Sequence, residues 1–406
     1  MRKIFLALDL GTTTLCGRLL DEEGQTLAEG KVSNPQRACG ADIIRRLEVA
    51  LAGEGERLQK LLIDGINALM GELLTSVGAE REEIVAVALA ANPGVTALLC
   101  GDDVRPILFP PHRPRDRSLR RLEIPELHLP VPLTIFPLLS GYVGGDLIAC
   151  LYGLPPFPGT TLCLDLGTNG EIALGSSDGW IATSVPAGPA FEGGEITCGQ
   201  VAAAGSISHL SVQNDRLQLE VIGGGIPTGL AGSGLFAVIS AGLTHGLIDR
   251  SGRILAASEV DSNLARYLLP DGQGHKLLLY RDASREIVVT QGDVRAFQLA
   301  KGAVRAGIDA LLARAGTSID QVEQVIVTGA FGLSLDRKGL KSVAILPDLM
   351  VEKALFIPGG ALAGVSRYLL QKDGCAQLQR VTAGVRSYPL SGTPAFERSF
   401  LGALNF

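Results

Sequence analysis

The sequence has 406 residues, of which 46% are hydrophobic and 19% charged, and its formal net charge is −6 at pH 7. A chain of this length can fill two or three domain-sized cores, and its acidic balance argues against nucleic-acid binding, which usually requires a basic field. No apolar run reaches the roughly 18 residues of a membrane span, and the N-terminus shows no signal-peptide pattern. We therefore expect a cytoplasmic protein.

Cysteine usage agrees with that expectation. The seven cysteines form no C-x-x-C pair, and the sequence has no iron–sulfur spacing such as C-x4-C-x2-C. Thiols spread in this way are typical of small buried side chains in a reducing compartment. We therefore expect no iron–sulfur cluster in this chain.

The first quarter of the chain alternates strands and helices. An apolar strand over 3–10 leads through a Gly-Thr turn into a second strand, and the Glu-Glu-Gly turn at 22–24 predicts a hairpin. Apolar residues at helical spacing predict helices over 41–52 and 56–78. The apolar run 84–92 predicts a buried strand.

Residues 106–137 differ in composition, since they are rich in Pro, Arg and His. This composition is typical of a surface crossover loop. The five arginines within residues 113–121 leave open a second interpretation, in which a basic segment contacts a partner or a phosphate.

The rest of the chain continues the alternation. Strands are expected at 160–167, 285–291 and 324–332, and a hairpin at 207–223. Residues after 370 are polar and predict loops, to which we assign no role. Helices are expected at 145–153, 234–246, 295–315 and 360–370.

One motif occurs twice, as "LALDLGTTT" at 6–14 and "LCLDLGTNG" at 162–170. In the first copy the strand carries Asp9 to its C-terminal end, and Gly11 permits a tight turn. The backbone N–H groups and hydroxyls of Thr12 and Thr13 then face an anion. A carboxylate beside them suits Mg²⁺, which keeps several of its waters.

The second copy has the same parts, which are Asp165, Gly167, Thr168 and Asn169, followed by Glu171. Two such turns in matching strand context indicate a duplicated α/β fold that holds a nucleotide and Mg²⁺, with Asp9 and Asp165 near the metal. The competing interpretation is two unrelated strand–turn units.

Asp146 lies at the start of the helix predicted over 145–153. It is a candidate base that orients the attacking water, and it is equally well explained as a group that caps the helix. Glu171 is the other carboxylate that could orient this water. The sequence leaves the choice open.

Two further stretches fit a nucleotide site. Gln298 and Lys301 fall on one face of a predicted helix, where they could hold ribose hydroxyls or phosphate, or simply face solvent. The strand over 324–332 ends in a turn that would let a flat base approach the backbone. Its residues are Gly329, Ala330, Phe331 and Gly332.

The order of these motifs resembles the superfamily of acetate and sugar kinases, heat-shock chaperones and actin (ASKHA). Residues 9–13 resemble its first phosphate motif and 165–170 its second. Residues 144–154 and 360–370 resemble its two connecting helices, and 325–332 its adenosine motif. The resemblance implies a duplicated ribonuclease-H-like fold with two lobes around an ATP cleft.

The match is closer to one branch, the ASKHA domain of the reductive activators of corrinoid proteins (RACo-like). The segments that carry this similarity are "NPQRACGADIIRRL", "GYVGGDLIA", "LDLGTNGEIALG", "AGPAFEGGEI", "GSGL", "TQGDVRAFQLAKGAV" and "GAFG". The implied domains are a first lobe over 1–155 with the crossover 106–137, a second lobe over 156–370, and a C-terminal extension over 371–406.

This resemblance implies a homodimeric ATPase that acts with Mg²⁺ on a corrinoid protein. Hydrolysis would be coupled to partner remodelling and to reduction of cobalt(II) to cobalt(I). Family members usually carry a ferredoxin-like domain with an iron–sulfur cluster, whereas this sequence has no cluster spacing. We therefore expect a separate ferredoxin-like electron donor. Related activators share a cluster across a dimer, for which Cys198 is the candidate here, although a lone buried thiol explains it better.

Two other functions remain open. A small-molecule kinase of the same superfamily would need an acceptor pocket and a base aligned with the acceptor hydroxyl. A nucleotide-gated metallocofactor chaperone or scaffold would bind ATP and a partner with little turnover.

Overall fold

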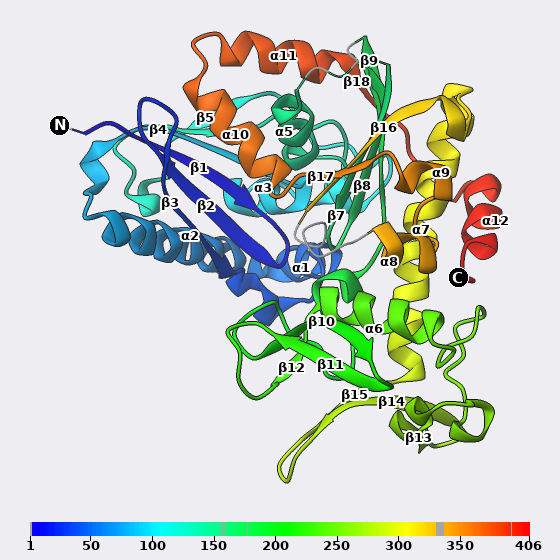
Figure 1. The fold of residues 1–406 in the computed structure, drawn as a ribbon. Helices are drawn as coiled ribbons and strands as arrows, with labels where there is room; N and C mark the ends of the chain where they lie inside the picture. Colours follow the sequence, from blue (N-terminus) through cyan, green and yellow to red (C-terminus); the bar gives the residue numbers. More distant parts are fainter. Residues whose placement is uncertain (1, 156, 158, 177, 330–336, 391) are drawn as a thin grey trace. The chain divides into compact units, whose positions relative to one another are not determined.

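The computed structural model describes residues 2–406 except 156, 158, 177, 330–336 and 391 (Figure 1). The chain folds into two compact units, and two of its five passages from one unit to the other fall within strands, namely β8 (Gly170–Ser176) and β9 (Gly179–Val185). Unit 1 consists of Met1–Pro158, Gly175–Thr183 and Gly359–Tyr388, and unit 2 consists of Gly159–Leu174, Ser184–Pro358 and Pro389–Phe406.

A six-stranded mixed sheet forms the centre of unit 1, in the order β3-β2-β1-β4-β6-β5. β1 runs antiparallel to β2 and parallel to β4. The predicted hairpin with its turn at 22–24 is confirmed, because β2 and β3 pair antiparallel on either side of it. The strands are β1 (Ile4–Leu10), β2 (Thr14–Leu20), β3 (Thr26–Ser33), β4 (Ile84–Ala91), β5 (Arg120–Leu122) and β6 (Leu133–Ile135).

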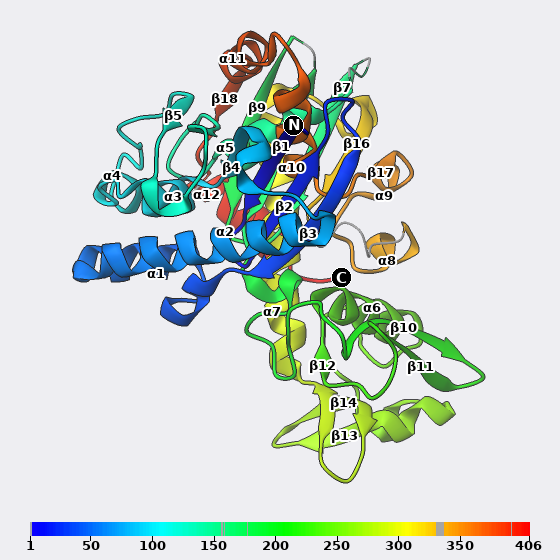
Figure 2. The same ribbon diagram turned by 90° about the vertical axis from the view of Figure 1, so that its left-hand side faces the viewer.

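Helix α2 (Gly55–Val77) packs on β2 and β3 (Figure 2). Its apolar side chains recur three or four residues apart and are buried, as Leu62, Ile66 and Leu73 show. A Cβ at Gly17 in β2 would lie 2.9 Å from Leu73 Cδ1, so this glycine lets the helix approach the strand closely.

Helix α10 (Gly360–Leu370) covers the opposite face of the same sheet. Arg18 follows Gly17 in β2 and therefore points to the other face, where its Nη1 donates to Ser366 Oγ at 3.3 Å. α10 also packs on α5 (Gly145–Gly153), where a Cβ at Gly364 would lie 1.8 Å from Ala149 O. The two helices meet backbone to backbone because glycine carries no side chain.

The second large sheet has the order β17-β16-β7-β8-β9-β18. β16 is parallel to β7 and places Thr328 opposite Asp165. The order β9-β8-β7-β16 repeats the order β3-β2-β1-β4 of unit 1. The predicted duplicated α/β fold is therefore confirmed. The remaining strands of this sheet are β7 (Thr160–Leu166), β16 (Val322–Thr328), β17 (Ala354–Phe356) and β18 (Val385–Ser387).

Helix α7 (Gln291–Ala315) begins four residues before the predicted start. Thr290 and Asp293 form a capping box, in which the Asp293 backbone N–H donates to Thr290 Oγ1 at 3.3 Å and the Thr290 N–H donates to Asp293 Oδ2 at 2.8 Å. This cap defines the start of the helix, whereas apolar spacing alone pointed to Arg295.

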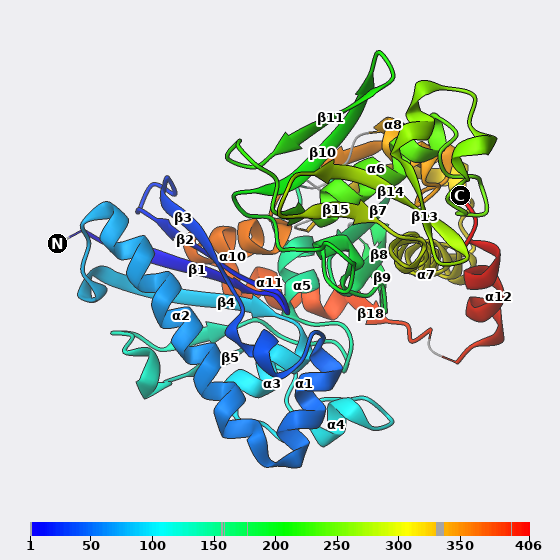
Figure 3. The ribbon, with the colours of Figure 1, turned by 90° about the horizontal axis from the view of Figure 1, so that it is seen from below.

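The prediction of loops after residue 370 is wrong. The structure has α11 (Gly374–Gly384), β18 and α12 (Pro394–Gly402) there, and α12 lies beside α7 (Figures 1 and 3). Thr393 caps α12 and the buried Phe396 faces inward. A short polar helix of this kind depends on tertiary packing, so its composition resembles that of a loop.

Two three-stranded sheets are inserted in unit 2 between β9 and α7 (Figure 3). The predicted hairpin at 207–223 is confirmed, and its turn residues Asn214 and Asp215 have φ values of 49° and 55°. Positive φ at both positions is typical of a two-residue type I′ turn. The strands are β10 (Ser206–Gln213), β11 (Arg216–Val221), β12 (Gly229–Leu230), β13 (Leu268–Asp271), β14 (Gly274–Arg281) and β15 (Glu286–Val289).

The segment 106–137 is only partly a surface loop. Its strand β6 is buried, with Leu133 and Ile135 each 1% exposed, and it pairs with β4 and β5 in the unit 1 sheet. Interpreting the whole segment as a surface crossover is therefore wrong for residues 133–135.

The other α-helices of the two units are α1 (Ile43–Val49), α3 (Pro93–Cys100), α4 (Arg105–Leu108), α6 (Gly232–Thr244), α8 (Arg337–Ser342) and α9 (Asp348–Val351). Within the described residues, no helix is both long and apolar enough to cross a membrane.

Candidate functional site

The first Asp-x-Gly-Thr turn joins β1 to β2 in unit 1. Asp9 lies near the end of β1, and the Gly11 N–H donates to Thr14 O at 2.9 Å. A Cβ at Gly11 would lie 2.8 Å from that carbonyl oxygen, so the turn requires glycine. Thr12 and Thr13 are 6% and 7% exposed. The structure therefore brings these predicted residues together in one tight turn, which we call loop 1 (residues 11–13).

Loop 1 is held by a segment further along the chain. Asn34 Nδ2 donates to Gly11 O at 3.0 Å, and Arg46 Nη1 donates to Thr12 O at 2.7 Å. Both side chains are buried, at 1% and 0% exposure. Both residues lie in the stretch "NPQRACGADIIRR" at 34–46, which carries part of the resemblance to the family, although neither residue was assigned a role of its own from the sequence.

A third contact ties loop 1 to the start of α5. Asn92 Nδ2 donates to Thr12 Oγ1 at 3.1 Å, while its Oδ1 caps α3. A Cβ at Gly144, the N-cap of α5, would lie 2.7 Å from Asn92 Cα. The N-terminus of α5 therefore packs on the residue that contacts loop 1.

Asp146 lies in the first turn of α5. Its Oδ1 accepts a hydrogen bond from the Leu147 N–H at 2.8 Å. Burial raises the pKa of Asp146 to about 6, against the opposite effect of the backbone N–H groups of Leu147, Asp146 and Gly144. A carboxyl group with such a pKa can take up a proton near neutral pH. The contact with Leu147 also fits a helix-capping role, so both predicted roles stay open.

The second turn joins β7 to β8 in unit 2, and its residues 167–169 are called loop 2. Asp165 lies near the end of β7, and the Gly167 N–H donates to Asn169 O at 3.1 Å. Thr168 Oγ1 donates to Glu192 Oε2. Glu192 ends the short helix η5 (Pro189–Glu192). It lies in the segment "AGPAFEGGEI", which carries part of the family resemblance, but the residue itself was assigned no role from the sequence.

Glu171 lies inside β8 and is 6% exposed. Its Oε1 accepts a hydrogen bond from Ser184 Oγ at 3.2 Å. The predicted role of Glu171 in orienting water stays a prediction.

Gly329 follows β16 with φ +92°, a conformation that other residues rarely adopt. A Cβ there would lie 2.5 Å from Asp165 Oδ1 and 2.6 Å from Leu166 O. The glycine therefore lets the end of β16 come close to the end of β7. The other predicted residues of this turn, Ala330, Phe331 and Gly332, lie outside the described residues.

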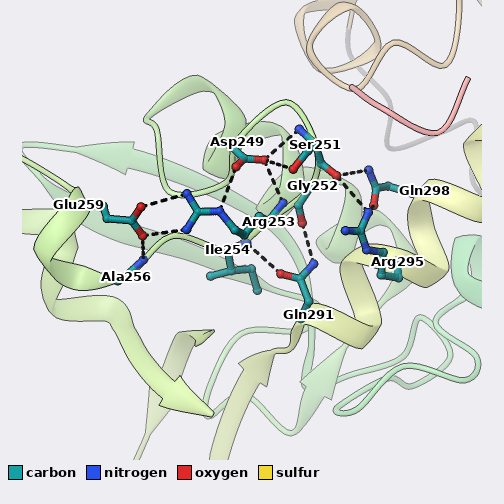
Figure 4. Close-up of polar contacts among 10 residues, drawn as sticks. All are labelled: Asp249, Ser251, Gly252, Arg253, Ile254, Ala256, Glu259, Gln291, Arg295 and Gln298. Atoms are coloured by element: carbon teal, nitrogen blue, oxygen red, sulfur yellow. Dashed lines mark hydrogen bonds and ion pairs between the residues drawn. The ribbon is translucent and has the colours of Figure 1, made fainter. Parts of the chain in front are cut away.

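Gln298 and Lys301 lie on α7, each 1% exposed. Gln298 Nε2 donates to Ser251 O at 3.0 Å, and Arg295 Nη1 donates to Gln298 Oε1 at 2.6 Å (Figure 4). Gln298 Nε2 also donates to Leu404 O at 2.9 Å. These groups tie the loop after α6 and the C-terminal residues to one face of α7. The alternative in which Gln298 and Lys301 face solvent is wrong for both residues, because both side chains are buried.

Lys301 contacts the same C-terminal residues. Its Nζ donates to Asn405 O and lies 5.1 Å from the centroid of the Phe406 ring. Burial lowers the pKa of Lys301 to about 8, and the Arg305 charge acts in the same direction. A nucleotide role for Gln298 and Lys301 stays a prediction, and in this structure both have protein partners.

The remaining candidates have local partners. Arg115 pairs with Asp103, Arg120 pairs with Asp102 at 2.6 Å, and both pairs reduce the basic character of the segment 113–121. Cys198 Sγ accepts from the Val288 N–H at 3.5 Å. Among the described residues, no group of three or more His, Cys, Asp or Glu side chains could hold a metal ion.

The repeated strand order around two Asp-x-Gly-Thr turns, together with α5 and α10, defines a protein of the ASKHA class. Residues 159–406 match the family described as the C-terminal domain of RACo, the ASKHA domain, and residues 4–154 match the RACo middle region. The chain therefore belongs to the RACo family, the reductive activators of corrinoid proteins.

Individual relatives agree with the family match. The chain is 29% identical to the corrinoid activation enzyme RamQ of Eubacterium limosum, over 98% of this chain and 69% of that protein. It is 23% identical to the [Co(II) methylated amine-specific corrinoid protein] reductase of Methanosarcina barkeri, over 91% of this chain and 70% of that protein.

A solved structure gives the same result. The reductive activator for corrinoid, iron-sulfur protein superposes with a TM-score of 0.90 at 30% identity, over 100% of this chain and 66% of that one. The chain thus spans about two thirds of the length of these relatives.

Proposed function

We propose that this chain is an ATP-dependent reductive activator of a corrinoid protein, or the ATPase component of one. The observation that carries this proposal is the match over the whole chain to a reductive activator at a TM-score of 0.90. Two curated relatives named for corrinoid activation and corrinoid-protein reduction support it.

ATP with Mg²⁺ is the proposed cofactor, and each unit has features that suit it. Loop 1 has small buried residues around a turn that only glycine fits, and in unit 2 Gly329 permits close backbone approach beside Asp165. Mg²⁺ bound to a nucleotide typically uses one or two carboxylates plus phosphate oxygens and waters. Asp9 and Asp165 would serve as these carboxylates, and Mg²⁺ would neutralise phosphate charge.

The phosphates would contact Gly11, Thr12 and Thr13 of loop 1 and Gly167, Thr168 and Asn169 of loop 2. Gly329 and the residues that follow it would contact the base. Gln298 and Lys301 would contribute only if the C-terminal residues 404–406 moved away from α7, because those residues occupy their polar groups here. Asp146 or Glu171 would orient the attacking water.

The reaction would transfer one electron to the corrinoid, so that cobalt(II) becomes cobalt(I). We propose that a separate reduced ferredoxin-like protein supplies this electron. The chain would act as a cytoplasmic homodimer, with ATP hydrolysis linked to remodelling of the corrinoid partner.

The test is an anaerobic reconstitution with a cobalt(II) corrinoid protein, reduced ferredoxin and MgATP, followed by the corrinoid absorption spectrum. We expect cobalt(I) only when all components are present, and much less with the Asp9→Ala variant. Cobalt(II) that persists in every mixture would contradict the proposal. ATP-dependent phosphorylation of a metabolite would instead favour the kinase, and partner capture without turnover would favour the scaffold.

A further inference from the structure

The carbonyl groups of loop 1 are held from one side. Three successive carbonyl oxygens accept hydrogen bonds from the segment 34–46. Gly11 O accepts from Asn34 Nδ2 at 3.0 Å, and Thr12 O accepts from Arg46 Nη1 at 2.7 Å. Thr13 O accepts from the backbone N–H of Asn34 at 2.9 Å.

The direction of these carbonyls fixes the direction of the neighbouring amides. A trans peptide unit is planar, and its C=O and N–H groups point in opposite directions. The peptide bonds of loop 1 are trans. When Gly11 O and Thr12 O are held toward the segment 34–46, the N–H groups of Thr12 and Thr13 are therefore directed away from it. Successive N–H groups arranged in this way bind anions.

The side chains of Asn34 and Arg46 are themselves held in one orientation. Arg46 Nε also donates to Gly40 O at 2.9 Å, so its planar guanidinium is fixed at two points. Asn34 Oδ1 accepts from the Gln36 N–H at 3.0 Å, which fixes the orientation of the amide group.

We infer that Asn34 and Arg46 are positioning residues that orient the N–H groups of loop 1 toward the phosphate of a nucleoside triphosphate. They act through the backbone and do not touch the ligand. This inference rests on the proposed nucleotide binding, and it deepens that proposal by assigning the residues that make loop 1 an anion site.

The test compares Arg46→Lys and Asn34→Asp with matched controls. Arg46→Lys keeps the charge but loses the fork that reaches two carbonyls. Asn34→Asp keeps the acceptor for Gln36 N–H and replaces the donor to Gly11 O with an oxygen. Arg45→Lys changes the adjacent, exposed arginine. Asn67→Asp removes a donor to a carbonyl, Glu126 O, elsewhere in unit 1.

The readouts are the Kd values of MgATP, tripolyphosphate and adenosine, with the melting temperature as a folding check. We expect Arg46→Lys and Asn34→Asp each to weaken MgATP and tripolyphosphate binding about tenfold. Adenosine binding should stay within about twofold of wild type, and both controls should bind all three ligands normally. A general packing defect would weaken all three ligands together.

Each other outcome is decisive. Unchanged MgATP and tripolyphosphate affinity in folded variants overturns the inference, and so does an equal loss for adenosine. A wild-type protein that binds tripolyphosphate but not MgATP contradicts the proposed nucleotide function, while the variants still decide the role of Asn34 and Arg46. A wild-type protein that binds neither ligand overturns both proposals.

Discussion

Loop 1 and loop 2 have nearly the same sequence, but their side-chain partners differ: loop 1 accepts hydrogen bonds from its partners, and loop 2 donates one to its partner. In loop 1, buried donors from Asn34 and Arg46 hold backbone carbonyls, and the loop receives hydrogen bonds. In loop 2 the Thr168 hydroxyl donates to the Glu192 carboxylate. The repeated motif therefore specifies the shape of the turn. The segments around each turn specify whether hydrogen-bond donors or an acceptor lie beside it. The direction of the hydrogen bonds favours an anion at loop 1, whereas the carboxylate beside loop 2 favours a cation such as Mg²⁺.

The largest expected effect comes from removing either repeated aspartate. Asp9→Ala and Asp165→Ala should each lower ATP hydrolysis by about a hundredfold or more, because the proposed Mg²⁺ site would lose a carboxylate. The matched control is Asp64→Ala, which removes an exposed carboxylate from α2. Steady-state ATPase assays check this prediction. Full activity in both aspartate variants would contradict the proposed role of Asp9 and Asp165 in holding Mg²⁺.

Replacing Gly329 should damage loop 2 without touching loop 1. Gly329→Ala places a Cβ 2.5 Å from Asp165 Oδ1 in a backbone with φ +92°. The control is Gly316→Ala, which has φ +64° but no atom within 4 Å of the new Cβ. The control should cost about 1 kcal/mol of the free energy of unfolding, and Gly329→Ala more, with weaker ATP binding. Urea unfolding measures the stability of the two variants, and ATP titration measures their affinity. Equal losses in Gly329→Ala and Gly316→Ala would contradict a close approach of residue 329 to Asp165.

Asp146 offers a test through pH, because its pKa is raised from 3.8 to about 6. The folded state then holds this proton more tightly than the unfolded chain, so stability falls as pH rises from about 4 to 6 and stays lower above 6. Asp146→Asn should therefore stabilise the fold by about 3 kcal/mol at pH 8 and by little at pH 4.

Urea unfolding at the two pH values checks the stability effect, and ATPase activity separates the two roles of Asp146. Loss of hydrolysis in a stabilised Asp146→Asn protein would assign the carboxylate to the reaction. Retained hydrolysis would assign it to the helix terminus. Equal stability changes at both pH values would contradict the effect of burial on its pKa.

The smallest expected effect concerns the carboxylate beside loop 2. Glu192→Gln keeps an acceptor for the Thr168 hydroxyl, so MgATP affinity should stay within about threefold of wild type. Glu192→Ala removes the acceptor and should weaken MgATP binding about fivefold, in line with one hydrogen bond. Calorimetric titration distinguishes the two variants. Identical affinities for wild type, Glu192→Gln and Glu192→Ala would show that loop 2 needs no such support.

Much of the fold could be predicted from the sequence, because the signals are local. Apolar spacing identified α2 and α5, and the Asn-Asp pair after β10 marks the turn of the predicted hairpin. The errors occurred where packing overrides composition. The buried strand β6 lies in a Pro- and Arg-rich segment, and α12 is a short polar helix that packs on α7.

The sequence by itself determined that the chain has two copies of one strand–turn–strand unit, and it located Asp9, Asp165 and the loop residues. Strand periodicity and a glycine turn are encoded within a few neighbouring residues. Only the tertiary structure identified Asn34, Arg46 and Glu192 as partners of the loops, and only it showed Gln298 and Lys301 beneath the C-terminal residues. Hydrogen bonds between distant segments depend on how the whole chain folds, and no local pattern records them.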